Sequence, residues 1–473
     1  MRNRLTASVA ALTVLSACSD PTVPDLNNPP RAEYENITTR SKIQALATGL
    51  IDADRDAYGP QLTYSEIIAR DLFRIDPAEP RYTTQLLGTS IGNSNFLGNS
   101  TWGIPYSTIL QARVLARGID SANVEVAPVT AGEKAATRGF ALTVAGLQYI
   151  RIIETRDTRG IAIQGADENA TVEPLVCKPR ALTRISAILD SAATDLRTAG
   201  ATAFPFALPS GFTAISTPDA AAGPDFLQFN RGLKAKVEMY RGFIPLQTAG
   251  NSTAAPDAAA LTAALTAIDQ SYVNATPTRA ALDFGAYHAY STAGGENTNP
   301  LADQGVFRAN PKVLAEAEPG DLRVQAKLDT TSTNRVLSQG SGTTLITSRI
   351  ILRYPGGPTD RLGLLKNGEL VLNRALILWG LNRDAEALQM VNVVRQAAGL
   401  APAVFADRQA LLRGILREKR YELLFESPAR YVDFRMLGIL NELGRERGNN
   451  PIATFPIPNN ESVARSGSIT CAP

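Results

Sequence analysis

Residues 368–400 read GELVLNRALILWGLNRDAEALQMVNVVRQAAGL and predict a pair of antiparallel helices. Apolar residues recur at helical spacing over residues 369–381 and again over residues 383–398. We expect a tight turn at Asn382 between the helices, and we expect Gly399 to end the second one. A hairpin of this kind buries little apolar surface alone and is stabilised by stacking on neighbouring hairpins. The stretch therefore predicts a stacked helical scaffold.

Helical patterns extend over much of the chain on both sides of this hairpin. Asp407 suits an N-cap for a helix that should run through Phe425. Thr130-Ala-Gly-Glu133 matches a capping box, which marks the start of another helix. Further helices are predicted at residues 43–50, 179–200, 230–243 and 256–273. Small residues at the hairpin crossing are similar to those of tetratricopeptide-type helix pairs: Ala375, Gly380, Ala385 and Ala387.

Residues 276–366 differ in character from the helical parts. Gly, Pro, Asn, Ser and Thr are frequent there, and residues 343–351 form a short β-branched run. This composition predicts long loops with a few small strands, and loops of such length in a compact protein are usually functional. The predicted fold class is mostly α: a helical scaffold with long loops and a few short strands.

The N-terminus has the pattern of a secretory signal peptide over residues 1–17. Two arginines precede an apolar run that is too short to span a bilayer as a helix. Residues 15–18, Leu-Ser-Ala-Cys, resemble the lipobox of bacterial lipoproteins, which implies that Cys18 becomes the acylated first residue. Residues 18–31 hold several prolines without apolar periodicity, so we expect a lipidated, extended tether. Residues 32–473 are then predicted to form one domain.

The charge balance argues against nucleic acid as a partner. The chain has 47 Lys and Arg against 45 Asp and Glu, a formal charge of +2. Removal of residues 1–17 takes away Arg2 and Arg4 and no acid, so the remaining side chains balance. A neutral protein has no overall field that would hold nucleic acid or an acidic membrane. We therefore expect the membrane link to come from the N-terminal lipid.

Three blocks in the C-terminal half carry a resemblance to a known family. The hairpin of residues 368–400 is followed by ILREKRYELLFESPARYVDFRML at 415–437 and by IATFPIPNNE at 452–461. In this order and spacing the blocks resemble the SusD/RagB family of outer-membrane nutrient-binding lipoproteins. Residues 102–109, WGIPYSTI, resemble a further feature of that family.

The resemblance implies a cell-surface lipoprotein of the outer membrane that acts without catalysis and without a cofactor. Such a protein would bind an oligosaccharide or another nutrient in its loops. It would dock on a SusC-like, TonB-dependent barrel transporter and deliver the nutrient inward. Its function would rest on different affinities in open and closed states.

Aromatic side chains are the candidate ligand surface, because sugar rings present apolar C–H faces that stack on flat groups. Trp102 lies in a Gly- and Ser-rich segment, and both a core position and a ligand position are open for it. The loop-rich segment adds four further candidates: Phe284, Tyr287, Tyr290 and Tyr354. Packing under a long loop is the alternative for these four.

The cysteine and histidine content limits metal chemistry. Cys177 and Cys471 remain beside Cys18 and can pair in an oxidising compartment, although sequence alone leaves their pairing open. A single histidine, His288, excludes the usual zinc ligand sets. Residues 52–56, DADRD, hint at a calcium loop but lack its glycine and closing glutamate, so we expect a helix end with solvated acids. No metal site is predicted.

Charged residues border the apolar stripe of the helix that should end at Phe425. A carboxylate in such a position is tolerable only when it is paired. We therefore expect Glu422 and Glu426 to form a structural ion network with Arg430 and Arg435 just beyond the helix. Asp433 lies in the same segment and is assigned to the network.

Two other functional classes are weighed against nutrient binding. Residues 88–92, GTSIG, match the nucleophile elbow of serine hydrolases, which would make Ser90 the nucleophile and His288 its base. The elbow needs a strand before it and a helix after it, and residues 93–98 are a poor helix, so a glycine-rich turn is favoured. The third class is an envelope scaffold lipoprotein without a small ligand.

Overall fold

The computed structural model describes residues 35–163, 172–331, 336–341 and 344–472. The predicted signal peptide, Cys18 and the tether of residues 18–31 lie outside these ranges, as does the start of the predicted domain. Among the helices of the described residues, none is long and apolar enough to cross a membrane.

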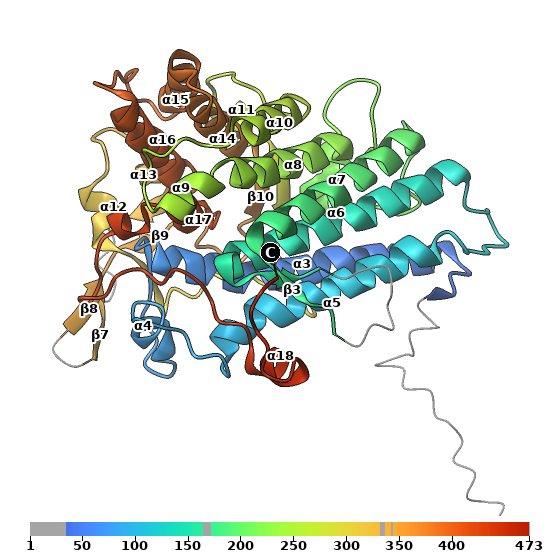
Figure 1. The fold of residues 1–473 in the computed structure, drawn as a ribbon, viewed down its shortest axis with the longest axis horizontal. Helices are drawn as coiled ribbons and strands as arrows, with labels where there is room; N and C mark the ends of the chain where they lie inside the picture. The colour runs from blue at the N-terminus through green and yellow to red at the C-terminus, as the bar shows by residue number, and fades with distance from the viewer. Residues whose placement is uncertain (1–34, 164–171, 332–335, 342–343, 473) are drawn as a thin grey trace, which may run out of the picture.

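Helices dominate the structure and stack in chain order, from the blue helix α3 to the green helix α8 (Figure 1). Neighbours along the chain pack side by side: α3 on α5, α5 on α6, α6 on α7 and α7 on α8. The bounds of this first stack are α3 Arg40–Ile68, α4 Arg81–Thr84, α5 Phe96–Gly118, α6 Ala131–Arg156, α7 Lys178–Ala199, α8 Phe226–Gly242, α9 Ile244–Ala249 and α10 Ala258–Asp269. Mostly α architecture is therefore confirmed.

Local sequence signals explain where these helices begin and end. The Thr130 side chain accepts the N–H of Glu133, and the Glu133 carboxylate accepts the N–H of Thr130, so the predicted capping box is present. Asp225 caps α8 and Asp407 caps the helix Arg408–Glu422, and each carboxylate accepts a backbone N–H of the first turn. The predicted helix starts at Thr130 and Asp407 are confirmed, whereas the helix predicted from Asn230 begins four residues earlier, at Phe226.

The C-terminal half adds a second group of helices, most of which lie above the first stack in Figure 1, whereas the last of them lies below it. Its elements are α14 Asn367–Gly380, α15 Asp384–Ala397, α16 Arg408–Glu422, α17 Ala429–Met436 and α18 Asn459–Ala464. The hairpin α14–α15 is the predicted pair, with Asn382 in the turn at a positive φ of 60°. A Cβ on Gly380 would come within 2.3 Å of Leu261, so glycine permits α14 to approach α10 closely. Ala385 is exposed and is not part of the crossing.

The loop-rich segment contains short helices and paired strands between the two helical groups. Its helices are α11 Arg279–Leu282, α12 Pro311–Ala315 and α13 Leu322–Lys327. Its strands are β4 Gly285–His288, β5 Phe307–Ala309, β6 Leu328–Asp329, β7 Leu337–Ser341, β8 Thr344–Ser348, β9 Ile351–Leu352 and β10 Leu362–Lys366. Earlier in the chain lie the strands β1 Leu72–Arg74, β2 Ile161–Ala162 and β3 Leu175–Val176. Three 3₁₀ turns lie outside the loop-rich segment, at Asp157–Arg159, Ser210–Ile215 and Leu440–Leu443.

All the strand pairs are antiparallel and two-stranded: β1–β5, β4–β10, β2–β3, β6–β9 and β7–β8. The pair β4–β10 matters most for the site, because it joins the beginning of the loop-rich segment to its end, directly before α14. Tyr287 pairs with Gly363 in that register, and a bulge follows between Gly363 and Leu365.

Two local predictions are corrected. The helix expected to run through Phe425 ends at Glu422, and Phe425 has a φ of +63°. Residues 52–56 lie in the middle of α3 rather than at a helix end, and Asp54 is buried rather than solvated. One hydrophobic cluster extends from Ile37 to Ile457 and ties both helical groups together.

Candidate functional site

The predicted aromatic residues do not form one exposed surface. Tyr287 and Tyr290 are buried, at 4 % and 8 % exposure. The Tyr287 ring lies under the Arg361 guanidinium, 4.0 Å from its centroid, and the Tyr287 hydroxyl donates to the Asp283 carbonyl. These two residues pack around β4, in agreement with the alternative that they are buried under a long loop.

Trp102 is likewise part of the core. It lies in α5 at 4 % exposure, with the Tyr106 ring 4.7 Å away and the Arg156 guanidinium 5.2 Å from its own centroid. The Gly- and Ser-rich segment around it is helical, so one face of the helix carries the ring inward. The structure therefore favours the core position for Trp102, one of the two positions that the sequence left open.

Phe284 and Tyr354 keep part of their side chains exposed. The Phe284 ring meets the Tyr272 ring edge-on, with centroids 5.3 Å apart at an interplanar angle of 78°. Tyr354 donates from its hydroxyl to the Arg361 carbonyl at 2.8 Å. Among the five candidate aromatics, Phe284 lines a hollow of the described residues.

This hollow, the Phe284 cavity, has a volume of about 750 Å³. Four elements supply its walls: the start of α8, the turn after α10, helix α11 and the first residue of α14. The lining comprises residues 223–224, Gln228, residues 271–275, residues 280–281, Phe284 and Asn367. The cavity therefore lies where the loop-rich segment meets the helical stack.

Buried hydrogen bonds fix the walls of the Phe284 cavity. The Asn367 side chain donates to the Asn274 carbonyl at 2.7 Å and to the Ala281 carbonyl at 2.9 Å. It also accepts the N–H of Asn274 at 2.8 Å. The Tyr272 hydroxyl donates to the Leu365 carbonyl at 2.7 Å, which ties the turn after α10 to β10. The hydrogen bonds of Asn367 and Tyr272 therefore hold the cavity walls in place.

Charged groups next to the cavity are paired with one another. Arg279 of α11 contacts the Glu422 carboxylate, with Nη1 at 2.9 Å from Oε2, and its Nε lies 2.9 Å from Asp283 Oδ2. Asp225, beneath the start of α8, is buried and accepts the backbone N–H of Gln228 at 2.7 Å. Among the described residues that line the cavity, none carries a charge.

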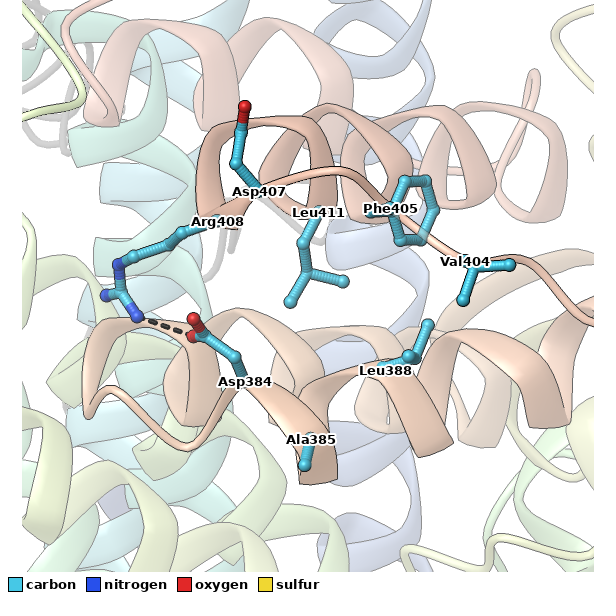
Figure 2. A pocket seen from close by; sticks show the side chains of 8 residues that line it. All are labelled: Asp384, Ala385, Leu388, Val404, Phe405, Asp407, Arg408 and Leu411. Atoms are coloured by element: carbon cyan, nitrogen blue, oxygen red, sulfur yellow. Dashed lines mark hydrogen bonds and ion pairs between the residues drawn. The ribbon is translucent and has the colours of Figure 1, made fainter.

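A smaller pocket lies between α15 and α16 (Figure 2). It has a volume of about 280 Å³, with Ala385, Leu388 and Leu411 along its sides and the Arg408–Asp384 ion pair at one end. Val404 stands at its rim, and Phe405 lies beside it. This volume lies just below the range of about 300–1,000 Å³ that is typical of ligand pockets, so we regard the larger Phe284 cavity as the candidate ligand site.

The predicted ion network is present in composition but wrong in pairing. All five residues are buried or nearly so, yet the two glutamates do not contact Arg430 or Arg435. The observed partners come from distant segments: Arg279 for Glu422, Lys327 and Lys366 for Glu426, Asp71 for Arg430, Lys419 for Asp433 and Asp157 for Arg435. The chain turns after Glu422, which directs the side chains of the next helix to other neighbours.

These pairings keep the two buried glutamates ionised. Burial by itself raises the pKa of Glu422, but the adjacent Arg279 guanidinium outweighs it and lowers that pKa to about 2. Burial likewise opposes Lys327 and Lys366 at Glu426, and the net effect lowers its pKa. Both carboxylates are therefore anions at neutral pH, and they hold the loop-rich segment to the end of α16 and to the turn that follows it.

Comparisons with known proteins place the fold. No protein-family model and no curated protein matches the sequence. The structure is similar to surface glycan-binding protein A from Bacteroides thetaiotaomicron, with a TM-score of 0.64 at 15 % identity over 91 % of this chain and 98 % of that one. It is also similar to a SusD homolog from the same organism, with a TM-score of 0.64 at 16 % identity over 91 % of this chain and 97 % of that one. NanU from B. fragilis matches with a TM-score of 0.61 at 15 % identity over 95 % of this chain and 98 % of that one.

The chain has the SusD-like fold. The family resemblance of the C-terminal blocks is therefore confirmed at the level of architecture. The structure of surface glycan-binding protein A is also known in complex with laminarihexaose, and this chain matches that complex with a TM-score of 0.63 at 16 % identity over 91 % of this chain and 98 % of that one.

The serine hydrolase alternative lacks its geometry in this SusD-like chain. Ser90 is exposed, and residues 85–92 form turns and irregular backbone where the elbow requires a strand. His288 is 1 % exposed, and its Nε2 lies 2.8 Å from the Asp54 carboxylate, to which it donates. The residues that the elbow needs are therefore not arranged for nucleophilic attack.

The two cysteines left open by the sequence have a structural role. Cys177 and Cys471 form a disulfide, and Val176 pairs with Ala472 beside it, so the end of the chain is fixed to the start of α7. Within the described ranges, no group of three or more His, Cys, Asp or Glu residues is placed to hold a metal ion.

Sequence reasoning missed Gln228 and Asn274 as possible ligand contacts. Both are ordinary polar residues near helix ends, and no motif distinguishes them. A signal was nevertheless present, because Phe284 follows shortly after Asn274 in the segment predicted to carry function.

Proposed function

We propose that this protein binds a glycan at the bacterial cell surface and delivers it to a TonB-dependent barrel transporter, without catalysis. The observation that carries the proposal is the fold, which is shared over 91 % of the chain with a surface glycan-binding protein. A second support is the lipobox-like Cys18, which would attach the mature chain to the membrane. The balanced charge of the remaining chain leaves that attachment to the lipid.

Delivery requires a partner that forms a passage through the outer membrane. Helical faces of the scaffold are proposed to pack on the barrel, while the loop-rich segment and the Phe284 cavity meet the ligand. Ligand capture then depends on the difference in affinity between an open and a closed arrangement of the two proteins. A scaffold lipoprotein without a small ligand would need neither the barrel nor the cavity.

Co-purification from detergent-solubilised membranes tests the delivery step. An affinity-tagged full-length chain is expected to bring down a large TonB-dependent barrel protein identified by mass spectrometry. The matched control is Cys18→Ala. Cells grown with radioactive palmitate should label the wild-type chain but not this variant, and the variant should be released from the membrane. Recovery of the wild-type lipoprotein without any barrel partner would argue for the scaffold class instead.

A further inference from the structure

We propose that the Phe284 cavity binds an uncharged sugar residue of the glycan. The inference rests on the proposed function and names the ligand class and the contacts of its site. It combines three observations: an uncharged lining, a partly exposed aromatic ring, and two side-chain amides with unused hydrogen-bonding groups.

The size of the cavity suits a small part of a glycan. Ligand pockets in proteins generally measure about 300–1,000 Å³, and the Phe284 cavity, at about 750 Å³, lies within that range. Asn274, Ala275 and Ala280 at its rim are exposed, so the cavity is reached from solvent. A longer chain could therefore place one residue inside and continue outward.

The apolar part of the cavity offers a platform for a sugar ring. Phe284 is half-buried, and its edge-on contact with Tyr272 fixes the ring orientation. Pro224 supplies a second flat, apolar group on the α8 side. The C–H face of a pyranose can pack on such surfaces while its hydroxyl groups point toward polar neighbours.

The polar part of the cavity offers uncommitted amides. Among the described residues, the Gln228 side chain has no hydrogen-bond partner, and the Asn274 amide nitrogen has none either. Asn274 Oδ1 accepts the N–H of Thr276 at 2.9 Å, so its amide nitrogen is oriented and available to donate. A primary amide both donates and accepts, which matches the hydroxyl groups of a sugar.

The electrostatics disfavour an acidic sugar. No cationic side chain lines the cavity among the described residues, so a carboxylate or sulfate would lose its hydration without compensation. The nearby Arg279 is occupied by Glu422 and Asp283. Buried Asp225 lies behind the start of α8 and would repel an anion when ionised. Uncharged sugars meet none of these penalties.

The test is a glycan array of neutral and uronic-acid oligosaccharides, with titration calorimetry on the strongest neutral binder. Phe284→Ala is expected to weaken binding about tenfold, and Gln228→Ala and Asn274→Asp about threefold to tenfold each. Phe405→Ala is the matched control, because Phe405 is also a half-buried phenylalanine but belongs to the α15–α16 pocket. It should leave affinity unchanged, and thermal melts should show that all variants are folded.

Each contrary outcome overturns a distinct statement. If the wild-type chain binds neutral glycans and the three cavity variants bind equally well, the site assignment is wrong while the proposed function stands. If acidic glycans bind more tightly, with affinity that falls as salt rises, the assigned ligand class is wrong. If the wild-type chain binds no glycan on the array, the proposed function itself is contradicted, and the inference falls with it.

Discussion

His288 of β4 lies 2.8 Å from the carboxylate of Asp54 in the middle of α3, and both side chains are 1 % exposed. Arg151 of α6 completes the cluster with two contacts to the same carboxylate, at 2.6 and 2.8 Å. Three elements far apart in the chain are thereby joined at one buried charge. The junction connects β4 of the loop-rich segment to the helical stack.

Removal of the Asp54 carboxylate should be strongly destabilising. Asp54→Ala leaves the Arg151 guanidinium buried without its partner, which typically costs about 3–5 kcal/mol. Asp52→Ala on the same helix is the control, because Asp52 is half exposed and its ion pair with Arg55 is worth about 0–1 kcal/mol. Urea denaturation measures both free energies of unfolding. Equal effects of the two variants would contradict the junction.

His288 should make stability depend on pH in the weakly acidic range. Burial lowers its pKa below the ordinary value of 6.5, although the bond to Asp54 opposes this. Below about pH 6.5 the unfolded chain therefore binds more protons than the folded chain, and the free energy of unfolding decreases as pH falls. The slope is at most about 1.4 kcal/mol per pH unit. The chain has one histidine, so in His288→Gln the free energy of unfolding should depend less on pH between pH 6.5 and 5. Urea denaturation at several pH values measures this dependence.

Glu422 should hold the loop-rich segment against α16. Glu422→Ala removes one of the two carboxylate partners of Arg279, which keeps Asp283, so we expect a loss of about 1.5–3 kcal/mol in the free energy of unfolding. Glu442→Ala, which removes an exposed pair with Arg413, should cost about 0–1 kcal/mol. Since the folded pKa of Glu422 is about 2 and its ordinary value 4.5, its contribution is present above pH 4.5 and is lost as pH falls toward 2. An unchanged melting temperature for Glu422→Ala would refute the clamp.

The Cys177–Cys471 disulfide should stabilise the protein and protect its C-terminal end. The two cysteines are 294 residues apart, so the bond restricts the unfolded chain over a long loop. A Cys177→Ser, Cys471→Ser double variant should lose about 2–4 kcal/mol and be trimmed faster by carboxypeptidase. Reductant should shift the wild-type denaturation curve toward that of the variant. Free thiols at both positions in the purified wild type would contradict the bond.

The sequence patterns predicted local structure better than distant contacts. Apolar spacing and capping residues located α6, α14, α15 and the start of α16, because these signals act within a few residues. The end of α16 was overestimated, since the apolar pattern continues to Phe425 while the backbone turns at Leu423. Burial of Asp54 in mid-helix was missed, because its partners Arg151 and His288 come from other elements.

The candidate site was predictable only in part, for the same reason. Composition marked residues 276–366 as functional, and Phe284 in that segment does line the cavity. Tyr287 and Tyr290 resemble it in sequence context, but β4 pairs with β10 and turns both of them into the core. Glu422 finds its partner Arg279 at a separation of 143 residues, which no local pattern encodes.

The central claim is that a glycan is bound and released uncut. Titration calorimetry of the purified chain with its strongest glycan from the array, followed by mass spectrometry of the recovered glycan, tests it most directly. We predict saturable binding and a glycan of unchanged length after prolonged incubation. Absence of binding heat, or recovery of shortened fragments, would contradict the account.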